Sequence, residues 1–327
     1  MKHITIIACE GSNLGSIDNP RRAFIAVNQF LMKKGKPPAF KVELAGLSPS
    51  IRLDNGLCTL HPDVVLKDLK TTDLIIIPAF DGEIEQGLLK CEEFIPWILK
   101  QYKAGAEIAS LCVGAFLLAK TGLLNGRNCS THWRVANEFR QKFPDVHLVA
   151  DKVITDEQGI YSSGGSFSSA NLILYIIEKY VGREAAIFCS KIFQVDFDRH
   201  SQSPFIIFQG QKGHEDEQIK KAQDYIEKNY HEKITVDTLT SLVSVGRRSF
   251  ERRFKKATSN SVVEYMQRVK IEAAKLFLET GRENVNEVMY QIGYSDPKAF
   301  RTIFKKITGL SPLEYKNRYN RELSVLN

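Results

Sequence analysis

The chain has 327 residues, 43% of them hydrophobic and 25% charged, so it is long enough for two globular domains and its composition excludes a disordered protein. Its apolar runs are short, and the stretch that begins at Met1 lacks the regions of a secretory signal. We therefore expect a cytoplasmic protein with no membrane contact.

The formal net charge of +7 is unevenly distributed. Residues 1–210 carry 23 Lys and Arg against 22 Asp and Glu, whereas residues 211–327 carry 22 against 16. An excess of this kind favours a polyanionic partner for the last third of the chain, although a solvated helical surface would give the same count.

The six cysteines are far apart in the sequence, and no two have the spacing of a zinc-binding pair. We therefore expect neither disulfides nor a structural metal, and no cofactor.

The first 210 residues alternate strand-like and helix-like patterns. The apolar runs are ITIIAC, FKVELAGL, DLIIIPAF and EIASLC, and amphipathic stretches such as CEEFIPWILKQYKAG separate them. Runs of this kind are typical of strands buried on both faces. The pattern predicts a three-layer α/β domain with a mostly parallel sheet covered by helices.

Ligands of such sheets bind beyond the carboxyl ends of the strands, here at residues 9–11, 79–82 and 112. Glu10 and Asp81 could receive a cationic or amino group, or each could simply cap a turn. Gly82 and Gly114 would let backbone amides approach a carboxylate or an oxidised Cys112 sulfur.

Cys112 lies where a strand runs into Val113, Gly114 and an apolar helix, which is the strand-turn-helix arrangement of a nucleophile elbow. The helix dipole at that position would lower the pKa of the thiol and favour the thiolate. A cysteine at a strand end is nevertheless more often inert packing than a nucleophile.

The pattern CxGAFxLAxxGLLxGR, with THW twenty residues after the cysteine, resembles the class I glutamine-amidotransferase-like domains related to the PfpI proteases. SSGGSFSSANLILYIIEKYVGREAA and DRHSQSPF continue the likeness over most of residues 1–208. The resemblance implies that His132 joins the site of Cys112. Enzymes of this type have an acid two residues after the histidine, but here Arg134 stands there.

Two other His-x-acid spacings, His61 with Asp63 and His214 with Asp216, do not suit the required position after the cysteine. Asn171 stands where regulators of this kind often carry Asp. We therefore predict a ligand or redox sensor built on an enzyme fold, with a cysteine-dependent amidase or hydrolase as the alternative.

From Glu217 onward the periodicity is helical, and the polar segment 209–216 is the expected linker between domains 1–208 and 217–327. VDTLTSLVSVGRRSFERRFKK predicts a short helix with Val236, Leu239 and Leu242 inward, a tight turn at 243–246 and a second helix. This is helix-turn-helix spacing.

The sequence FERRFKKATSNSVVEYMQR at 250–268 recurs as FRTIFKKITGLSPLEYKNR at 300–318, with nine identities in nineteen positions. A second helix-turn-helix is therefore predicted, joined to the first by a long helix over 262–279. In each copy two phenylalanines four apart are expected inside, which leaves basic and polar residues facing outward. Two such helices could enter successive turns of one major groove.

This double unit resembles the DNA-binding domain of the AraC/XylS transcriptional regulators, and the first domain in front of it gives the architecture of the GlxA-type regulators. The resemblance implies a DNA-binding transcriptional regulator, not an enzyme. It further implies a homodimer, with promoter DNA, RNA polymerase and a small nitrogenous effector as partners. The residues expected at the DNA, by position, are Arg247, Arg248, Glu251, Arg252, Lys255 and Lys256 in the first unit and Ser295, Pro297, Lys298, Arg301, Thr302, Lys305 and Lys306 in the second.

The first unit departs from the family pattern, because Gly246 and Arg247 stand where a Ser-Pro start is common. The serine N-cap is lost there, so the start of this helix is less firmly defined by the sequence.

Overall fold

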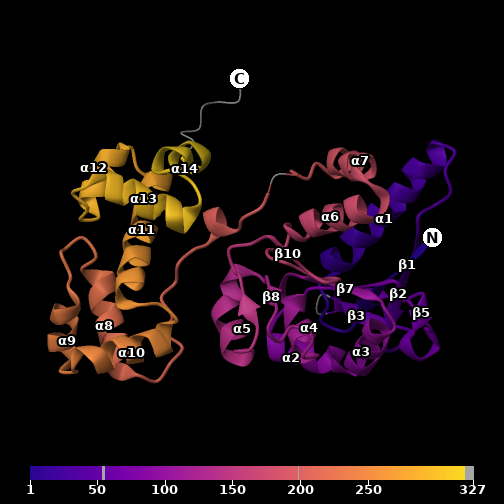
Figure 1. The fold of residues 1–327 in the computed structure, drawn as a ribbon, viewed down its shortest axis with the longest axis horizontal. Coiled ribbons are helices and arrows are strands. Elements are labelled where there is room, and N and C mark those ends of the chain that lie inside the picture. The colour runs from indigo at the N-terminus through magenta and orange to yellow at the C-terminus, as the bar shows by residue number, and fades with distance from the viewer. Residues whose placement is uncertain (54–55, 198, 321–327) are drawn as a thin grey trace. The chain divides into compact units, whose positions relative to one another are not determined.

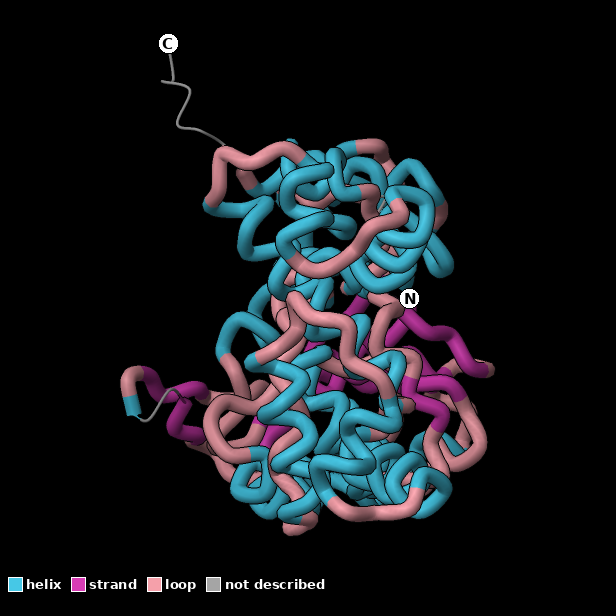
Figure 2. The backbone as a smooth tube through the Cα atoms, turned by 90° about the vertical axis from the view of Figure 1, so that its left-hand side faces the viewer, coloured by secondary structure: helices cyan, strands magenta, loops and turns pink. Residues whose placement is uncertain are grey.

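The computed structural model describes residues 1–53, 56–197 and 199–320. The chain divides into two compact units, Met1–Gln202 and Ser203–Asn327. Strands lie in the first unit, whereas the described part of the second consists of helices and loops (Figure 2). The domain boundary predicted at residue 208 lies close to this division.

The first unit is built on a seven-stranded sheet of order β10-β11-β7-β6-β1-β2-β5. Only β10 is antiparallel to its neighbour, so the predicted, mostly parallel sheet is confirmed. Two short pairs lie outside it, β3 (Ile51–Leu53) with β4 (Cys58–Leu60) and β8 (Asn128–Cys129) with β9 (His147–Leu148). The strands of the sheet are β1 (Lys2–Ala8), β2 (Phe40–Gly46), β5 (Val64–Val65), β6 (Leu74–Ile77), β7 (Glu107–Leu111), β10 (Ile154–Glu157) and β11 (Ile160–Ser163).

Helices cover both faces of the sheet (Figure 1). Successive residues of a strand point to opposite faces, so Leu74 and Ile76 of β6 join one hydrophobic core while Ile75 and Ile77 join the other. All four are fully buried, which explains the unbroken apolar run. The first core is closed by α1 (Leu14–Lys33), α6 (Ser169–Val181) and α7 (Arg183–Phe193), the second by α2 (Ile84–Cys91), α3 (Ile95–Lys103), α4 (Ala115–Lys120) and α5 (Ala136–Lys142).

The expectation of no disulfide is wrong for one pair of cysteines. Cys9, which follows β1, and Cys91, the last residue of α2, form a disulfide with their Cα atoms 5.7 Å apart. The two residues are 82 apart in the sequence, and the packing of α2 against the sheet brings them together. Spacing along the chain carries no information about such a contact. The cysteines that remain free are Cys58, Cys112, Cys129 and Cys189.

Among the residues that the structure describes, no helix is long and apolar enough to cross a membrane. The same residues contain no group of three or more His, Cys, Asp and Glu side chains that could hold a metal ion.

The second unit contains two helix-turn-helix motifs, α9 with α10 and α12 with α13, as the sequence predicts (Figure 1). The long helix α11 belongs to the cores of both motifs. Tyr265 and Val269 near its start pack into the first core, and Ala274 and Leu278 near its end pack into the second. The helices are α8 (Glu217–Lys228), α9 (Val236–Val243), α10 (Arg247–Thr258), α11 (Val262–Thr280), α12 (Val285–Gln291), α13 (Pro297–Thr308) and α14 (Pro312–Tyr319).

The repeated residues build the same local structure twice. In the first copy the ring of Phe254 lies 5.6 Å from that of Phe250 and 5.3 Å from that of Tyr265, and the corresponding distances in the second copy are 5.7 and 5.5 Å. Ser261 and Glu264 form a capping box at the start of α11. Ser311 and Glu314 form the equivalent box at the start of α14. The aromatic and capping residues are therefore the same in both copies because packing and helix initiation require them.

Candidate functional site

The carboxyl ends of β6, β1 and β7 lie next to one another, so the segments that follow them meet at one edge of the sheet. Two backbone hydrogen bonds join the segment after β1 to the segment after β6. Asn13 N donates to Ala79 O, and Asp81 N donates to Gly11 O, both at 2.8 Å. The chain order reverses between β1 and β6, which is where open parallel sheets bind ligands.

The backbone at Cys112 has the sharp turn that the sequence predicts. Cys112 has a φ of 54°, in the left-handed region that side chains other than glycine rarely adopt. A short turn of 3₁₀-helix over Cys112–Gly114 then leads into α4. A Cβ atom at Gly114 would lie 2.5 Å from the carbonyl oxygen of Pro78, so only glycine allows this close approach.

The expected thiolate at Cys112 is not supported by its surroundings. The residue is only 5% exposed, and burial raises the pKa of its thiol to about 11. Asp81 raises the pKa further, while the Val113 N–H and the Ser166 hydroxyl act in the opposite direction. The desolvation of a buried thiolate outweighs the helix dipole here, so the thiol is protonated at neutral pH.

His132 is half-buried and starts a short turn over Trp133–Val135, where its Nδ1 accepts a hydrogen bond from Arg134 N at 3.1 Å. Burial lowers the pKa of the imidazole, and the charge of Arg134 lowers it further. The preceding residue touches the elbow directly, because Thr131 Oγ1 donates to Cys112 O at 2.9 Å. A role for His132 itself in the site stays a prediction.

Asp81 and Glu10 both have partners within the protein. Asp81 accepts two hydrogen bonds from Asn13 Nδ2, at 3.0 and 3.2 Å, and Asn13 in turn caps α1. Glu10 forms an ion pair with Lys90 of α2 at 3.9 Å. Gly82 has a φ of 75°, which makes glycine the favoured residue at this turn. A ligand amino group at these acids would therefore compete with existing contacts.

Gln202 organises the loops around Cys112, and the sequence analysis assigned it no role. The residue is 2% exposed. Its Nε2 donates to the carbonyl oxygens of Thr131 and Ala150 at 3.0 Å, and its Oε1 accepts from Gly165 N at 3.0 Å. The only sequence signal for it is its place in the DRHSQSPF segment.

His61, His214 and Asn171 each have a partner within the protein. His61 Nδ1 lies 3.2 Å from Pro49 O. His214 Nε2 lies 2.9 Å from Gln223 Oε1. Asn171 is buried and donates to the carbonyl oxygen of Asp196 at 2.5 Å.

The outward faces of α10 and α13 form the candidate DNA-binding surface of the second unit. Phe250 and Phe254 are buried, as are Phe300 and Phe304, so both helices have the predicted orientation. All thirteen residues named above as DNA contacts are exposed. A hollow lined by Arg301, Thr302, Lys305 and Lys306 lies on the outward face of α13.

Helices α10 and α13 differ in how their N-terminal ends are capped. Gly246 provides no side-chain cap for α10, in agreement with the missing serine noted above. At α13 Asp296 accepts a hydrogen bond from Lys298 N, and Pro297 occupies the first turn. Arg247, at the start of α10, is held by ion pairs to Asp237 and Glu251, each at 3.3 Å.

Arg253, on the same helix, does not face outward with its neighbours. It is half-buried, and its Nε and Nη2 donate to the two carboxylate oxygens of Asp216 at 2.8 and 2.6 Å. Asp216 caps α8, and the hydrogen bonds from Arg253 lower the pKa of its carboxyl. Arg253 therefore ties α10 to α8 and does not belong to the DNA-binding surface.

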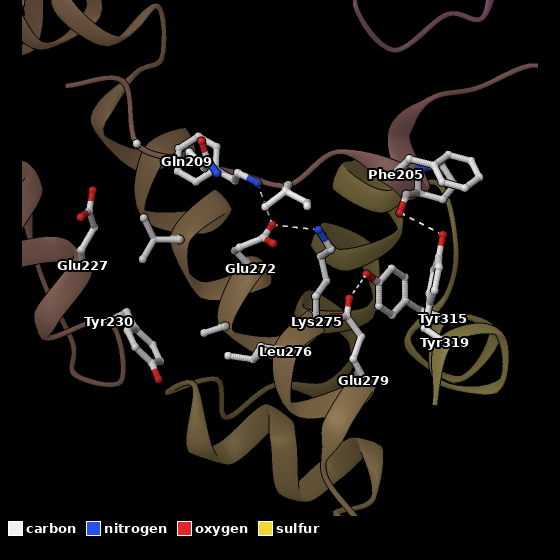
Figure 3. A pocket seen from close by; sticks show the side chains of 16 residues that line it. Phe205, Gln209, Glu227, Tyr230, Glu272, Lys275, Leu276, Glu279, Tyr315 and Tyr319 are labelled. Carbon is white, nitrogen blue, oxygen red and sulfur yellow. Dashed lines mark hydrogen bonds and ion pairs between the residues drawn. The ribbon is translucent and has the colours of Figure 1, made fainter. Parts of the chain in front are cut away.

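Residues 204–210, named here the strap, lie along α11 (Figure 3). Lys275 of α11 is 4% exposed, and its ammonium donates to Ile206 O at 2.6 Å and to Glu272 at 2.8 Å. The same carboxylate oxygen of Glu272 accepts from Phe208 N at 3.0 Å. At the other end Tyr319 of α14 donates to the carbonyl oxygen of Pro204 at 3.2 Å.

The repeated arginines Arg268 and Arg318 also contact the strap. Their guanidinium groups lie over the rings of Phe208 and Phe205, at 5.9 and 5.0 Å. The strap and α11 both line a pocket of about 690 Å³, and the charged groups of this lining bond to one another or to their neighbours (Figure 3).

Comparison with known proteins gives two family matches. Residues 32–179 match the DJ-1/PfpI family, and residues 239–318 match a helix-turn-helix domain family. The chain is 25% identical over 254 residues to the HTH-type transcriptional regulator GbdR of Pseudomonas aeruginosa, covering 77% of this chain and 68% of that protein. It is also 25% identical over 222 residues to the HTH-type transcriptional regulator ArgR of the same species, covering 67% of each.

Among solved structures, the chain is similar to a transcriptional regulator protein from Vibrio parahaemolyticus. The TM-score is 0.52 at 20% identity, and the match covers 58% of this chain and 98% of the other. At that identity the likeness concerns the fold alone, and it supports the α/β architecture described above.

Proposed function

Because this chain belongs to the AraC-type transcriptional regulators that carry a DJ-1/PfpI domain ahead of the helix-turn-helix domain, we propose that α10 and α13 read two adjacent major-groove segments of promoter DNA. The observation that supports this most directly is the outward display of basic and polar side chains on both helices over buried phenylalanine pairs. A site of about 17–20 base pairs fits two such segments.

Within this surface we propose that the first two turns of each helix contact bases. The lysines near the C-terminal ends of the helices are proposed to bind phosphates. Arg252 and Arg301 are exposed and carry the forked donors that suit guanine. Lys255, Lys256, Lys305 and Lys306 are exposed near the C-terminal ends of α10 and α13. They would contribute affinity for any sequence and most of the salt dependence.

The test begins with duplexes selected by the full-length protein from a random library. Arg252→Ala and Arg301→Ala should each weaken binding to the selected site by about 1–3 kcal/mol and relax specificity in a different half of it. Lys221→Ala, an exposed lysine on α8, serves as the control and should leave the footprint unchanged. Footprints unchanged in both arginine variants would contradict the assignment of these helices.

We further propose that the first unit senses a small nitrogenous metabolite at the strand ends. We also propose that this unit forms a homodimer, that the protein works in the cytoplasm, and that it acts on RNA polymerase. Glu10, Asp81, Gly82, Cys112, Gly114 and His132 are the proposed effector residues. The acids at residues 10 and 81 supply the negative charge that an amino group needs. Nothing lies within 4 Å of the position that a Cβ atom would take at Gly82, so a ligand can approach the backbone there.

A thermal-shift screen of amino acids, betaines and polyamines tests the effector site. A stabilising compound should lose its effect in Asp81→Asn and in His132→Ala. A ligand indifferent to Glu10, Asp81, Cys112 and His132 would place the site elsewhere.

We propose that the first unit regulates without catalysing a reaction, because this fits the surroundings of Cys112. A buried thiol with a raised pKa is a poor nucleophile, and Arg134 stands where the enzymes have an acid. Full-length Cys112→Ser should bind selected DNA as the wild type does. Amide hydrolysis by the wild type that is lost in Cys112→Ser would instead favour the enzyme.

A further inference from the structure

The disulfide between Cys9 and Cys91 adjoins Glu10, one of the proposed effector residues. Each cysteine neighbours a charged residue, and those neighbours, Glu10 and Lys90, form their own ion pair at 3.9 Å. The end of α2 is thus joined to the segment after β1 by two adjacent contacts, one covalent and one ionic.

The segment after β1 is held to the segment after β6 as well as to α2. Ser12 Oγ accepts from Cys9 N at 3.2 Å and lies 3.3 Å from Cys9 Sγ. Ser12 also forms a β-bridge with Phe80. The ring of Phe80 rests on α2, where a Cβ atom at Gly87 would lie 2.9 Å from it. The disulfide therefore closes a ring of contacts around the loops that carry Glu10 and Asp81.

The geometry and the compartment together indicate the role of this pair. A Cα separation of 5.7 Å suits a disulfide without backbone movement. A regulator that binds promoter DNA works where thiols are kept reduced, and disulfides there are mostly transient and redox-sensing.

We propose that Cys9 and Cys91 form a reversible redox switch, which fixes the loop of residues 9–13 against α2 when oxidised and releases it when reduced. The inference rests on the assignment of the chain as a DNA-binding regulator, since that function sets the compartment. The proposal places the redox-sensitive element at Cys9 and Cys91, and not at Cys112.

The oxidant is a low-molecular-weight disulfide such as glutathione disulfide. The thiolate of one cysteine attacks a glutathione sulfur, which forms a mixed disulfide and releases one glutathione thiolate. The thiolate of the second cysteine then attacks the protein sulfur of the mixed disulfide and displaces the second glutathione thiolate. The two protons lost by the cysteines end on the two glutathione molecules, and the reverse steps reduce the pair.

Both sulfurs lie in buried residues, with Cys9 2% and Cys91 0% exposed. Exchange therefore requires a local opening of the loop of residues 9–13, and it is slower than the reaction of an accessible thiol. Cys58, a half-exposed free cysteine of the same unit, provides the comparison.

The first measurement counts thiols in the full-length protein after equilibration with mixtures of reduced and oxidised glutathione. Acid-quenched samples are unfolded, alkylated and analysed by mass spectrometry. We expect all six cysteines to be alkylated after reduction and only four after oxidation, with positions 9 and 91 protected. Six alkylated cysteines at every ratio, or four even in fully reduced glutathione, would overturn the switch.

The second measurement follows amide hydrogen exchange of the native protein in the two redox states. Exchange at residues 9–13 and 84–91 should be faster in the reduced protein, and Cys91→Ser should show the fast rate in both states. Cys58→Ser is the matched control and should keep the difference between states. Equal exchange in oxidised and reduced wild type would also overturn the proposal. Neither measurement uses DNA, so failure here leaves the DNA-binding assignment standing.

Discussion

Cys112 combines an unusual backbone conformation with a buried side chain. Its left-handed φ and the close approach at Gly114 preserve the shape of a nucleophile elbow, while burial keeps the sulfur protonated.

The raised pKa of Cys112 makes its alkylation strongly pH-dependent. Only the thiolate reacts, so its reaction with iodoacetamide should be slow at neutral pH and rise about tenfold per pH unit. This rise should continue toward the pKa of about 11. Time courses of the labelled peptide between pH 7 and pH 10, read by mass spectrometry, measure the profile.

The same peptide in urea is the control for this profile, because an unfolded cysteine titrates near its ordinary pKa of about 8.5 and its rate levels off above it. A native profile that levelled off below pH 9 would contradict the burial argument.

For single residues, the sequence predicts well which polar side chains are exposed. It predicts poorly which groups surround a buried side chain. The exposure of Arg248, Arg252 and Arg301 follows from helical periodicity, which is a local property. The protonation of Cys112 and the bonds of Gln202 depend on loops more than thirty residues away. No pattern within either segment could show them.

One buried ammonium group, that of Lys275, binds both the strap and Glu272 of α11. Lys275→Met would leave Ile206 O without its donor and remove the cation from Glu272. We expect the free energy of unfolding of the second unit to fall by about 2–3 kcal/mol, because Ile206 O loses its donor and Glu272 loses its cation while both stay partly buried. Amide exchange at residues 204–210 should become faster, and urea titration of the full chain gives the energy.

Leu276→Met, at a 60% exposed position on the same helix, is the control and should change stability by less than about 0.5 kcal/mol. Unchanged exchange across the strap in Lys275→Met would show that the aromatic and Tyr319 contacts hold it without the lysine.

The sequence predicts the elements whose buried residues recur with a regular period. It does not predict the contacts of the irregular segments between them. The two helix-turn-helix motifs follow from buried residues three and four apart, repeated at an offset of fifty. The segment 209–216 has the polar composition of a linker, yet its side chains are bound: Lys212 pairs with Asp224 and Glu227, and Asp216 with Arg253. Composition reports on solvent exposure and cannot report on such specific contacts.

Dimerisation through the first unit is the prediction that concerns the whole molecule. The outer sides of α6 and α7 expose Tyr175, Ile187, Ile192 and Phe193, and Ile192 is 58% exposed. Exposed apolar residues gathered on neighbouring helices favour association about a two-fold axis. Sedimentation equilibrium of the full chain at micromolar concentration should therefore give a dimer.

Ile192→Glu should shift that equilibrium toward monomer and weaken DNA binding through lost avidity. Lys103→Glu, an exposed position on α3 against the opposite face of the sheet, is the control. A wild-type protein that sediments as a monomer would remove the dimer, whatever the variants do.

Helix α11 packs its first half into the core of one helix-turn-helix motif and its second half into the core of the other, so its length fixes the rotation of one motif relative to the other. Nineteen helical residues extend about 28 Å at 1.5 Å per residue, close to the roughly 34 Å repeat of the DNA double helix. One residue inserted at the middle of α11 would rotate α13 by about 100° relative to α10. Each motif could still fold, but the two could no longer face the same side of one straight duplex. If both helices bind one straight duplex, the outward residues of α10 and α13 can change without disturbing this phase, whereas the number of residues between the two helices cannot.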